Sequence, residues 1–362
     1  MTDDAGSALR IVQWTTGNVA REAVKAVIGR SDLDLIGAYA RSPDKSGIDI
    51  GRLCGLGTDI GVAATSNVDE LLAMRPDCVI HTPLFLDVPE LVEILRAGAN
   101  VVTSAEFLTG RNLPDDDQSA LADACREGNS TLFGSGINPG FMQMAAAVAT
   151  GMSTDVRSAS MTESVDVSQF IGDANFAAVG WGRPANDVGH ADDVRRATAV
   201  FAEAVDLFAR IMRVKLDDIT CAVEFAHAIE DFVADGVVIP AGNVAGMEVK
   251  WSGYAGGREV LSVNQRWVAT TALDSGWTVE HGYRLEIDGD PNVHVQFNMF
   301  PTVEDLADLT RERMRGIGLR ATAAPLVNAI PAVCAAGPGI VTYAELPVLS
   351  SPLQLGRNQT AS

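Results

Sequence analysis

The spacing of hydrophobic and polar positions changes near residue 150. Before that point, short apolar runs rich in β-branched residues alternate with amphipathic stretches that have helical spacing. This alternation is typical of a parallel sheet covered by helices, so residues 1–150 predict a Rossmann dinucleotide-binding domain in an α/β fold. The expected strands are 9–14, 33–40, 78–82, 100–103 and 130–133, and the expected helices are 19–28, 89–97 and 115–126.

After residue 151, apolar positions recur at every second residue over longer segments. Such patterning indicates strands with one buried face, which favours a mostly antiparallel or mixed sheet. The segments are 156–170, 219–232, 244–254, 260–271, 278–287 and 293–300, and one long helix is expected at 194–212. We therefore expect residues 151–302 to form a second α+β domain that binds substrate or forms a dimer.

The end of the chain returns to helical spacing. Helices are predicted at 303–315 and 323–335, and residues 303–345 are expected to pack back on the first domain. The first domain would then be discontinuous in sequence. Residues 350–362 are polar and are expected to form a tail without regular structure.

Composition mainly excludes classes of protein. The 362 residues include 27 Lys plus Arg against 47 Asp plus Glu, a net charge of −20. An acidic surface repels nucleic acid and anionic lipid. The apolar runs are shorter than the ~20 residues of a membrane span, and the acidic start is unlike a secretory signal. We expect a cytoplasmic protein with reduced thiols, because its five cysteines are widely separated, and no metal site, because its five histidines lack ligand spacing.

The turn after the first strand occupies the place of the dinucleotide fingerprint G-x-G-x-x-G/A. Gly17 supplies the middle glycine and Ala20 the small third residue, whereas Thr15 replaces the first glycine. A side chain at the middle position would hold a pyrophosphate away from the helix N-terminus. The alternative is an ordinary strand-to-helix turn that contains a glycine. The expected cofactor-binding residues here are Thr15, Thr16, Gly17, Asn18 and Val19.

The end of the second strand bears on the choice between NADP and NAD. An acidic residue there usually binds the ribose hydroxyls of NAD, whereas a basic residue receives the 2′-phosphate of NADP. Arg41 and Ser42, with Lys45, predict a phosphate clamp. This favours NADP while leaving NAD open, and the alternative is a basic loop exposed to solvent.

Three further segments lie at the carboxyl ends of predicted strands. In parallel α/β sheets, ligands bind at this edge. Thr82 and Pro83 lie at the end of the expected strand 78–82, and Glu106 follows the expected strand 100–103. The Glu106 carboxylate is suited to accept a proton from an ammonium group or to stabilise an iminium cation, with an exposed loop glutamate as the alternative. Asn138, after the expected strand 130–133, is expected to cap a helix with Pro139 at its first position and to hold a carboxamide or substrate.

Aromatic residues near glycines give candidates for substrate contact in the second half of the chain. An apolar wall for a substrate and ordinary core packing explain them equally well. For the histidine of this set, a core or surface role is the leading alternative to a polar contact. The candidates are Phe141, Phe170, Phe176, Trp181 and His190.

These motifs resemble a known family. IVQWTTGNVAREA at 11–23, RSPDK at 41–45, LCG at 53–55 and NPGF at 138–141 are similar to dihydrodipicolinate reductase N-terminal-domain proteins, within them the 2,4-diaminopentanoate dehydrogenase and native amine dehydrogenase group. The resemblance implies a two-domain NAD(P)-dependent enzyme that acts on a C–N bond. It also implies that Glu106, in Thr103-Ser104-Ala105-Glu106, is the catalytic carboxylate.

Two departures from the family narrow the substrate. Residues 163–169 lack the adjacent histidines and lysine of true dihydrodipicolinate reductases, which argues against lysine biosynthesis. No arginine near Asp166 or Ser168 is placed to pair with a substrate carboxylate, which favours a less polar amine or ketone over a diamino acid.

The sequence thus predicts an NADP-dependent amine dehydrogenase, with a small-molecule amine or ketone as substrate and a homodimer as its assembly. One alternative is an NADPH-dependent reductase of a C=O or preformed C=N bond that does not use free ammonia. The other is a nucleotide-binding sensor without catalysis.

Overall fold

The computed structural model of the chain describes residues 7–308 and 310–352. Its first domain is built on a parallel sheet in the order β15-β6-β5-β4-β1-β2-β3. The strands are β1 Leu9–Trp14, β2 Leu33–Tyr39, β3 Ala64–Thr65, β4 Cys78–His81, β5 Asn100–Thr103, β6 Thr131–Gly134 and β15 Gly339–Val341. The predicted Rossmann-type sheet is confirmed, and because its strands are parallel, their carboxyl ends meet at one edge.

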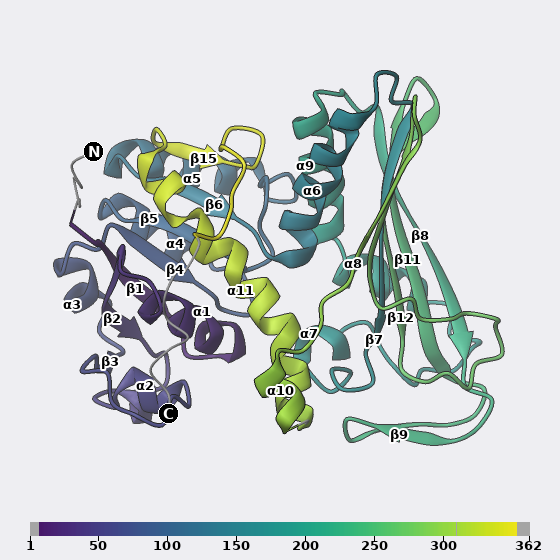
Figure 1. Ribbon diagram of the computed structural model, residues 1–362, viewed down its shortest axis with the longest axis horizontal. Helices are drawn as coiled ribbons and strands as arrows, with labels where there is room; N and C mark the ends of the chain where they lie inside the picture. The colour runs from purple at the N-terminus through teal and green to yellow at the C-terminus, as the bar shows by residue number, and fades with distance from the viewer. Residues whose placement is uncertain (1–6, 309, 353–362) are drawn as a thin grey trace.

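Helices cover both faces of this sheet (Figure 1). On one face, α1 and α11 pack against each other and against residues such as Ile11, Ile80 and Val102. On the other face, α4 and α5 cover Val12, Val79 and their neighbours. The helices of this domain are α1 Asn18–Ile28, α2 Ile50–Leu53, α3 Val68–Ala73, α4 Val88–Arg96, α5 Asp115–Gly128 and α11 Arg311–Ala335, with a 3₁₀ turn at Pro43–Lys45.

The end of the chain differs from the prediction of two helices at 303–315 and 323–335. A short helix, α10 Val303–Ala307, is followed by one long helix, α11, which continues through Pro325 and Pro331. Packing along α1 and the sheet holds α11 together across these prolines. The part Glu312–Ala335 is long and apolar enough to span a membrane, and its second half, from Ala323 to Val333, supplies buried residues to the core. The chain then adds β15, which the sequence did not predict, parallel to β6.

The second domain contains a mixed sheet in the order β14-β13-β7-β12-β11-β8. Only β7 and β12 are parallel among its pairs, so the predicted mixed sheet is confirmed. The strands are β7 Ser158–Asp166, β8 Asp218–His227, β11 Val244–Ala255, β12 Arg258–Val268, β13 Gly282–Asp288 and β14 Val293–Phe297. A separate hairpin, β9 Phe232–Ala234 and β10 Val237–Ile239, was not predicted.

Helices lie on the side of this sheet that faces the first domain (Figure 1). They are α6 Met142–Ala149, α7 Ala174–Ala177, α8 His190–Ala197 and α9 Val200–Met212. The helix predicted at 194–212 is therefore two helices, which separate at residues 198–199.

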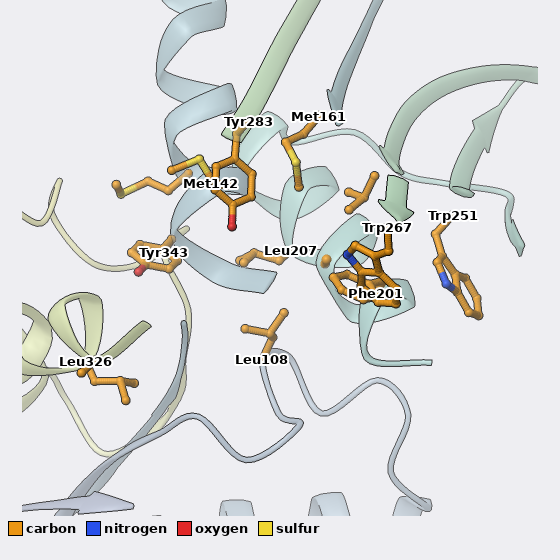
Figure 2. Packing of buried hydrophobic residues seen from close by; sticks show 14 of the residues in the cluster. Leu108, Met142, Met161, Phe201, Leu207, Trp251, Trp267, Tyr283, Leu326 and Tyr343 are labelled. Atoms are coloured by element: carbon orange, nitrogen blue, oxygen red, sulfur yellow. The ribbon is translucent and has the colours of Figure 1, made fainter. Parts of the chain in front are cut away.

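One apolar core joins the two domains. Figure 2 shows Leu108 and Tyr343 of the first domain near Leu207 and Tyr283 of the second, and all four belong to the same buried cluster. The carboxyl edge of the parallel sheet is therefore packed against the second domain. Groups that follow β5 and β6 lie at this junction.

Candidate functional site

The turn between β1 and α1 has the backbone of an anion site. Gly17 is extended just before α1, and a Cβ added to it would meet no atom within 4 Å. The first N–H groups of α1 are thus accessible to a phosphate. A side chain at position 17 would occupy the space in front of them. Thr15 adopts φ +81°, a conformation that favours glycine, and its Oγ1 donates to the Thr82 carbonyl at 3.1 Å. That hydrogen bond helps to stabilise a threonine in a backbone conformation for which the fingerprint uses glycine.

The loop after β2 lies beside this turn. Lys45 Nζ donates to Thr16 Oγ1 at 3.0 Å, so the predicted phosphate clamp contacts the turn between β1 and α1. Arg41 is exposed, with its guanidinium 3.8 Å from Glu90, and Ser42 donates to Asp44. Burial opposes ionisation of Glu90, but the hydrogen bond to His81 and the charge of Arg41 hold the pKa of Glu90 below its ordinary value. The basic side chains of this loop therefore lie close to two carboxylates, those of Glu90 and Asp44.

Residues at the end of β4 hold the edge of the sheet together. His81 is buried between Thr103 Oγ1 at 2.9 Å and Glu90 at 3.1 Å. The Thr82 hydroxyl accepts from Gln13 Nε2 at 2.9 Å. The Thr82 side chain is thus occupied by hydrogen bonds within the protein. Pro83, the next residue, is half-buried.

Glu106 lies on the loop that leaves β5. Its φ of +38° is unusual for a residue with a side chain, and strain of this kind is often found at functional sites. The side chain is exposed, and in the part of the chain that the structure describes its carboxylate has no hydrogen-bonding or ionic partner. Partial desolvation raises the pKa of Glu106 above the ordinary glutamate value. The arrangement leaves a carboxylate free to exchange a proton with a ligand.

A second carboxylate fixes this loop. Glu203 of α9 is 1% exposed and accepts backbone N–H groups along the segment that follows Glu106. Its Oε2 accepts from Leu108, Thr109 and Gly110 at 2.8, 2.9 and 3.2 Å, and its Oε1 accepts from Asn112 at 3.0 Å. Four donors satisfy a buried charge that would otherwise be costly. The second domain thereby sets the position of the Glu106 loop.

Asn138 does not cap a helix, which corrects the sequence prediction. Asn138 and Pro139 are extended, Gly140 has φ +128°, and α6 begins only at Met142. The Asn138 amide instead reaches into the second domain. Its Nδ2 donates to Glu163 Oε2 at 2.8 Å, and its Oδ1 accepts from Gln143 Nε2 at 3.1 Å.

The candidate aromatic residues fall into two groups. Phe170 and Phe176 are 6.0 Å apart between ring centroids, and Phe176 lies 5.3 Å from Trp267 of β12. His190 is buried elsewhere: it stacks on Phe225 of β8 at 4.4 Å and contacts the Val179 carbonyl, and burial lowers its pKa. Strands β12 and β11 separate β8 from the strand of Glu163. Trp181 is buried, and Phe141 packs partly buried at the start of α6.

Sequence reasoning missed three polar residues at this junction: Glu163, Gln265 and Tyr283. In its own strand, each of these three residues lies on the same face as the buried apolar residues. Glu163, for example, follows Ala159 and Met161 at spacings of two. A charged residue at an inward position of an alternating strand was the signal that would have found it. Across residues 7–308 and 310–352, no cluster of His, Cys, Asp and Glu is placed to hold a metal ion.

Comparison with known proteins agrees with this architecture. The chain is 26% identical to an amine dehydrogenase of Streptomyces virginiae, over 96% of this chain and 99% of that protein. A 4-hydroxy-tetrahydrodipicolinate reductase of Synechococcus elongatus is 39% identical over 19% of this chain and 30% of its own. In fold, an amine dehydrogenase from Mycobacterium smegmatis superposes with a TM-score of 0.76 at 23% identity, covering 96% of this chain and 98% of that one.

The family resemblance drawn from the sequence motifs is confirmed by a longer match. Residues 141–361, more than half of the chain, match the family model described as the 2,4-diaminopentanoate dehydrogenase C-terminal domain. The chain therefore belongs to the family of proteins that carry the 2,4-diaminopentanoate dehydrogenase C-terminal domain.

Proposed function

We propose that this chain is an amine dehydrogenase that uses NADP in preference to NAD and that Glu106 is its catalytic residue. The observation that carries the proposal is the Glu106 carboxylate itself. It is unpartnered within the described residues, it has a raised pKa, and it sits on a strained loop that Glu203 anchors. Family membership and the full-length similarity to an amine dehydrogenase support the same function.

The reaction converts an amine into a ketone or aldehyde. One substrate ammonium, one oxidised dinucleotide and one water give the carbonyl product, the reduced dinucleotide, one ammonium ion and one proton. When bound, the dinucleotide supplies the hydride acceptor. Residues 15–19 would hold its pyrophosphate at the start of α1, where the open space around Gly17 fits that group. Arg41, Ser42 and Lys45 would hold the 2′-phosphate.

Glu106 carries two steps in this scheme. Its carboxylate first takes a proton from the substrate ammonium, which leaves a neutral amine able to release hydride from the adjacent carbon. Glu106, which is exposed, then passes this proton to solvent, and its ionised carboxylate stabilises the iminium cation that forms on the substrate when hydride leaves. Water adds to that iminium, and ammonia leaves as the carbonyl product forms. Burial of the surrounding loop fixes the carboxylate before the substrate arrives.

A panel of simple primary amines assayed for NADP reduction tests this function. We expect turnover by the wild-type protein and a loss of at least about a hundredfold in kcat for Glu106→Ala. Glu93→Ala, an exposed substitution on α4, serves as the matched control and should retain wild-type activity. Wild-type turnover that survives Glu106→Ala would show that Glu106 is not the catalytic carboxylate.

Arg41→Ala tests the cofactor preference. Loss of a charge-assisted phosphate contact should raise KM for NADP by about tenfold or more while changing KM for NAD little. Arg52→Ala removes another exposed arginine, one that pairs with Asp59, and should leave both values unchanged. Equal increases for NADP and NAD in Arg41→Ala would contradict the phosphate clamp.

We also propose that the chain forms a homodimer through the open face of the second sheet. This face is turned away from α6 and α9 (Figure 1). It contains a polar hollow of about 340 Å³. Its basic residues Lys250, Arg266 and Arg284 are matched by acidic residues Glu248, Glu259 and Glu286. Two copies of a chain with net charge −20 repel each other over most of their surface. A face with balanced charges is therefore suited to a second copy.

A further inference from the structure

A polar row crosses the inward face of the second sheet. Tyr283 of β13, Glu163 of β7 and Gln265 of β12 are direct neighbours in register. The preceding inward positions on β7 and β12 are apolar and include Met161 and Val263. Three hydrogen-bonding side chains therefore interrupt a hydrophobic surface at the point where it approaches Asn138.

The Glu163 carboxylate is surrounded by neutral donors. Asn138 Nδ2 donates at 2.8 Å and the Tyr283 hydroxyl donates at 3.0 Å. Among the described residues, no lysine, arginine or histidine forms an ion pair with it. Burial of the group raises the pKa of Glu163 despite these donors. A cationic ligand would supply the missing counter-charge.

Gln265 provides a second, independent observation. Its side chain is 0% exposed, and neither Oε1 nor Nε2 has a hydrogen-bonding partner in the part of the chain that the structure describes. Each unsatisfied buried group costs about 1–3 kcal/mol. An amide kept in this state beside a buried carboxylate indicates a place that a polar ligand completes. Of the three residues only Glu163 retains more than a trace of exposed surface, so a ligand would approach the row from Glu163.

The row is connected to the edge where the reaction is proposed to occur. Asn138 follows β6, the neighbour of β5 in the parallel sheet, and Glu106 follows β5. The bond from Asn138 to Glu163 thus joins the polar row to that edge. A substrate whose amine meets Glu106 would extend its remaining atoms toward the second domain.

We infer that Glu163, Gln265 and Tyr283 form a subsite for a second hydrogen-bond-donating group of the substrate, an amine or hydroxyl away from the reacting carbon. The inference rests on the proposed amine dehydrogenase function. A substrate carboxylate in the same place would meet the Glu163 carboxylate without a cation between them, and like charges at short distance repel. The preferred substrate class is therefore a diamine or amino alcohol, with an amino acid disfavoured at this position.

The test compares kcat/KM for primary amines from propyl to hexyl, each unsubstituted and with a terminal hydroxyl, amine or carboxylate. For the best-fitting length, wild-type protein should prefer the hydroxyl or amine form over the unsubstituted one by about tenfold or more, with the carboxylate form poorest. A greater preference for the amine than for the hydroxyl would identify an ion pair, and the reverse a neutral hydrogen bond.

Glu163→Gln should bring the ratio between substituted and unsubstituted amines to about one, whatever happens to overall activity. Glu224→Gln, an exposed glutamate on the opposite face of the sheet, is the matched control and should keep the wild-type ratio. A merely structural role for Glu163 would lower all rates together. A wild-type ratio near one, or a ratio unchanged in Glu163→Gln, overturns the subsite.

Failure of the proposed function gives a different result. The wild-type protein would then turn over no amine, including the unsubstituted ones. In that case, calorimetric titration of 1,4-diaminobutane into the NADP-loaded protein still tests whether the subsite binds a diamine. Binding to wild type that is lost in Glu163→Gln supports the subsite, and absence of binding to wild type rejects it.

Discussion

Three glutamates at the domain junction differ in what surrounds each carboxylate. Glu203 is held by four backbone N–H groups, Glu163 by neutral side chains, and Glu106 by none among the described residues. A fully satisfied carboxylate serves structure, whereas one without protein partners is available to a ligand. The family resemblance singled out Glu106 from its place after the fifth strand. Glu163 and Glu203 depend on contacts between residues far apart in sequence, which a single sequence does not reveal.

The raised pKa of Glu106 predicts how activity depends on pH. Amine oxidation needs the ionised carboxylate, so kcat/KM should rise with pH through an inflection above the ordinary glutamate pKa of about 4.3. The pH profile of a simple amine measures that inflection. Glu93→Ala should show the same profile. An inflection at or below the ordinary glutamate value in wild type would be inconsistent with a desolvated base.

The raised pKa of Glu163 predicts an effect on stability. The folded chain binds this proton more tightly than the unfolded chain, so between the ordinary and the raised pKa the free energy of unfolding falls as pH rises. Glu163→Gln removes this loss. Its stability relative to wild type should therefore increase from about pH 4 to neutral pH, as urea unfolding measures. The relative stability of the exposed variant Glu224→Gln should stay constant, and a constant value for Glu163→Gln would contradict burial of the charge.

At the scale of elements, the sequence predicts long periodic segments better than short ones. The strand at Leu9–Trp14 and the helix at Asp115–Gly128 carry enough patterned residues to be recognised. The two-residue β3 and the three-residue β15 do not, and each exists because an existing edge of the parallel sheet pairs with it. Asn138-Pro139 is a position where the local sequence predicts the wrong structure. The sequence favours a helix start, but Asn138 is extended and forms a hydrogen bond across the domain junction instead.

The anchoring of one loop by α9 can be tested at this scale. Glu203→Gln keeps the size of the side chain but removes its charge and one acceptor, which should lower the free energy of unfolding by about 2 kcal/mol. Because the anchored loop carries Glu106, kcat should fall more than KM for NADP changes. Chemical denaturation and steady-state kinetics measure the two effects.

Asp206→Asn is the control for this anchor. It lies on the same helix and removes ion pairs to Arg111 and Arg210, which are partly exposed and worth little. Its kcat and stability should remain near wild type. If Glu203→Gln behaves like Asp206→Asn, the four backbone contacts do not control the loop.

At the scale of the whole molecule, one face of the second sheet is committed to the junction and the other is open. The inward face packs on α6 and α9 and carries the Glu163 row, while the outward face carries small hydroxyl residues such as Ser160 between charged side chains. This division follows from strand alternation, in which adjacent residues point to opposite faces. Substrate binding and self-association therefore use the same strands without competing for residues.

Ser160→Arg should separate the proposed dimer. Ser160 lines the hollow, so a long charged side chain there would block a second copy while extending into solvent in the monomer. Light scattering during gel filtration should show wild-type dimers and variant monomers, with an unchanged rate per chain if the site lies within one chain. Ser119→Arg, exposed on α5 of the first domain, should remain dimeric. Dimers that persist in Ser160→Arg would place the interface elsewhere.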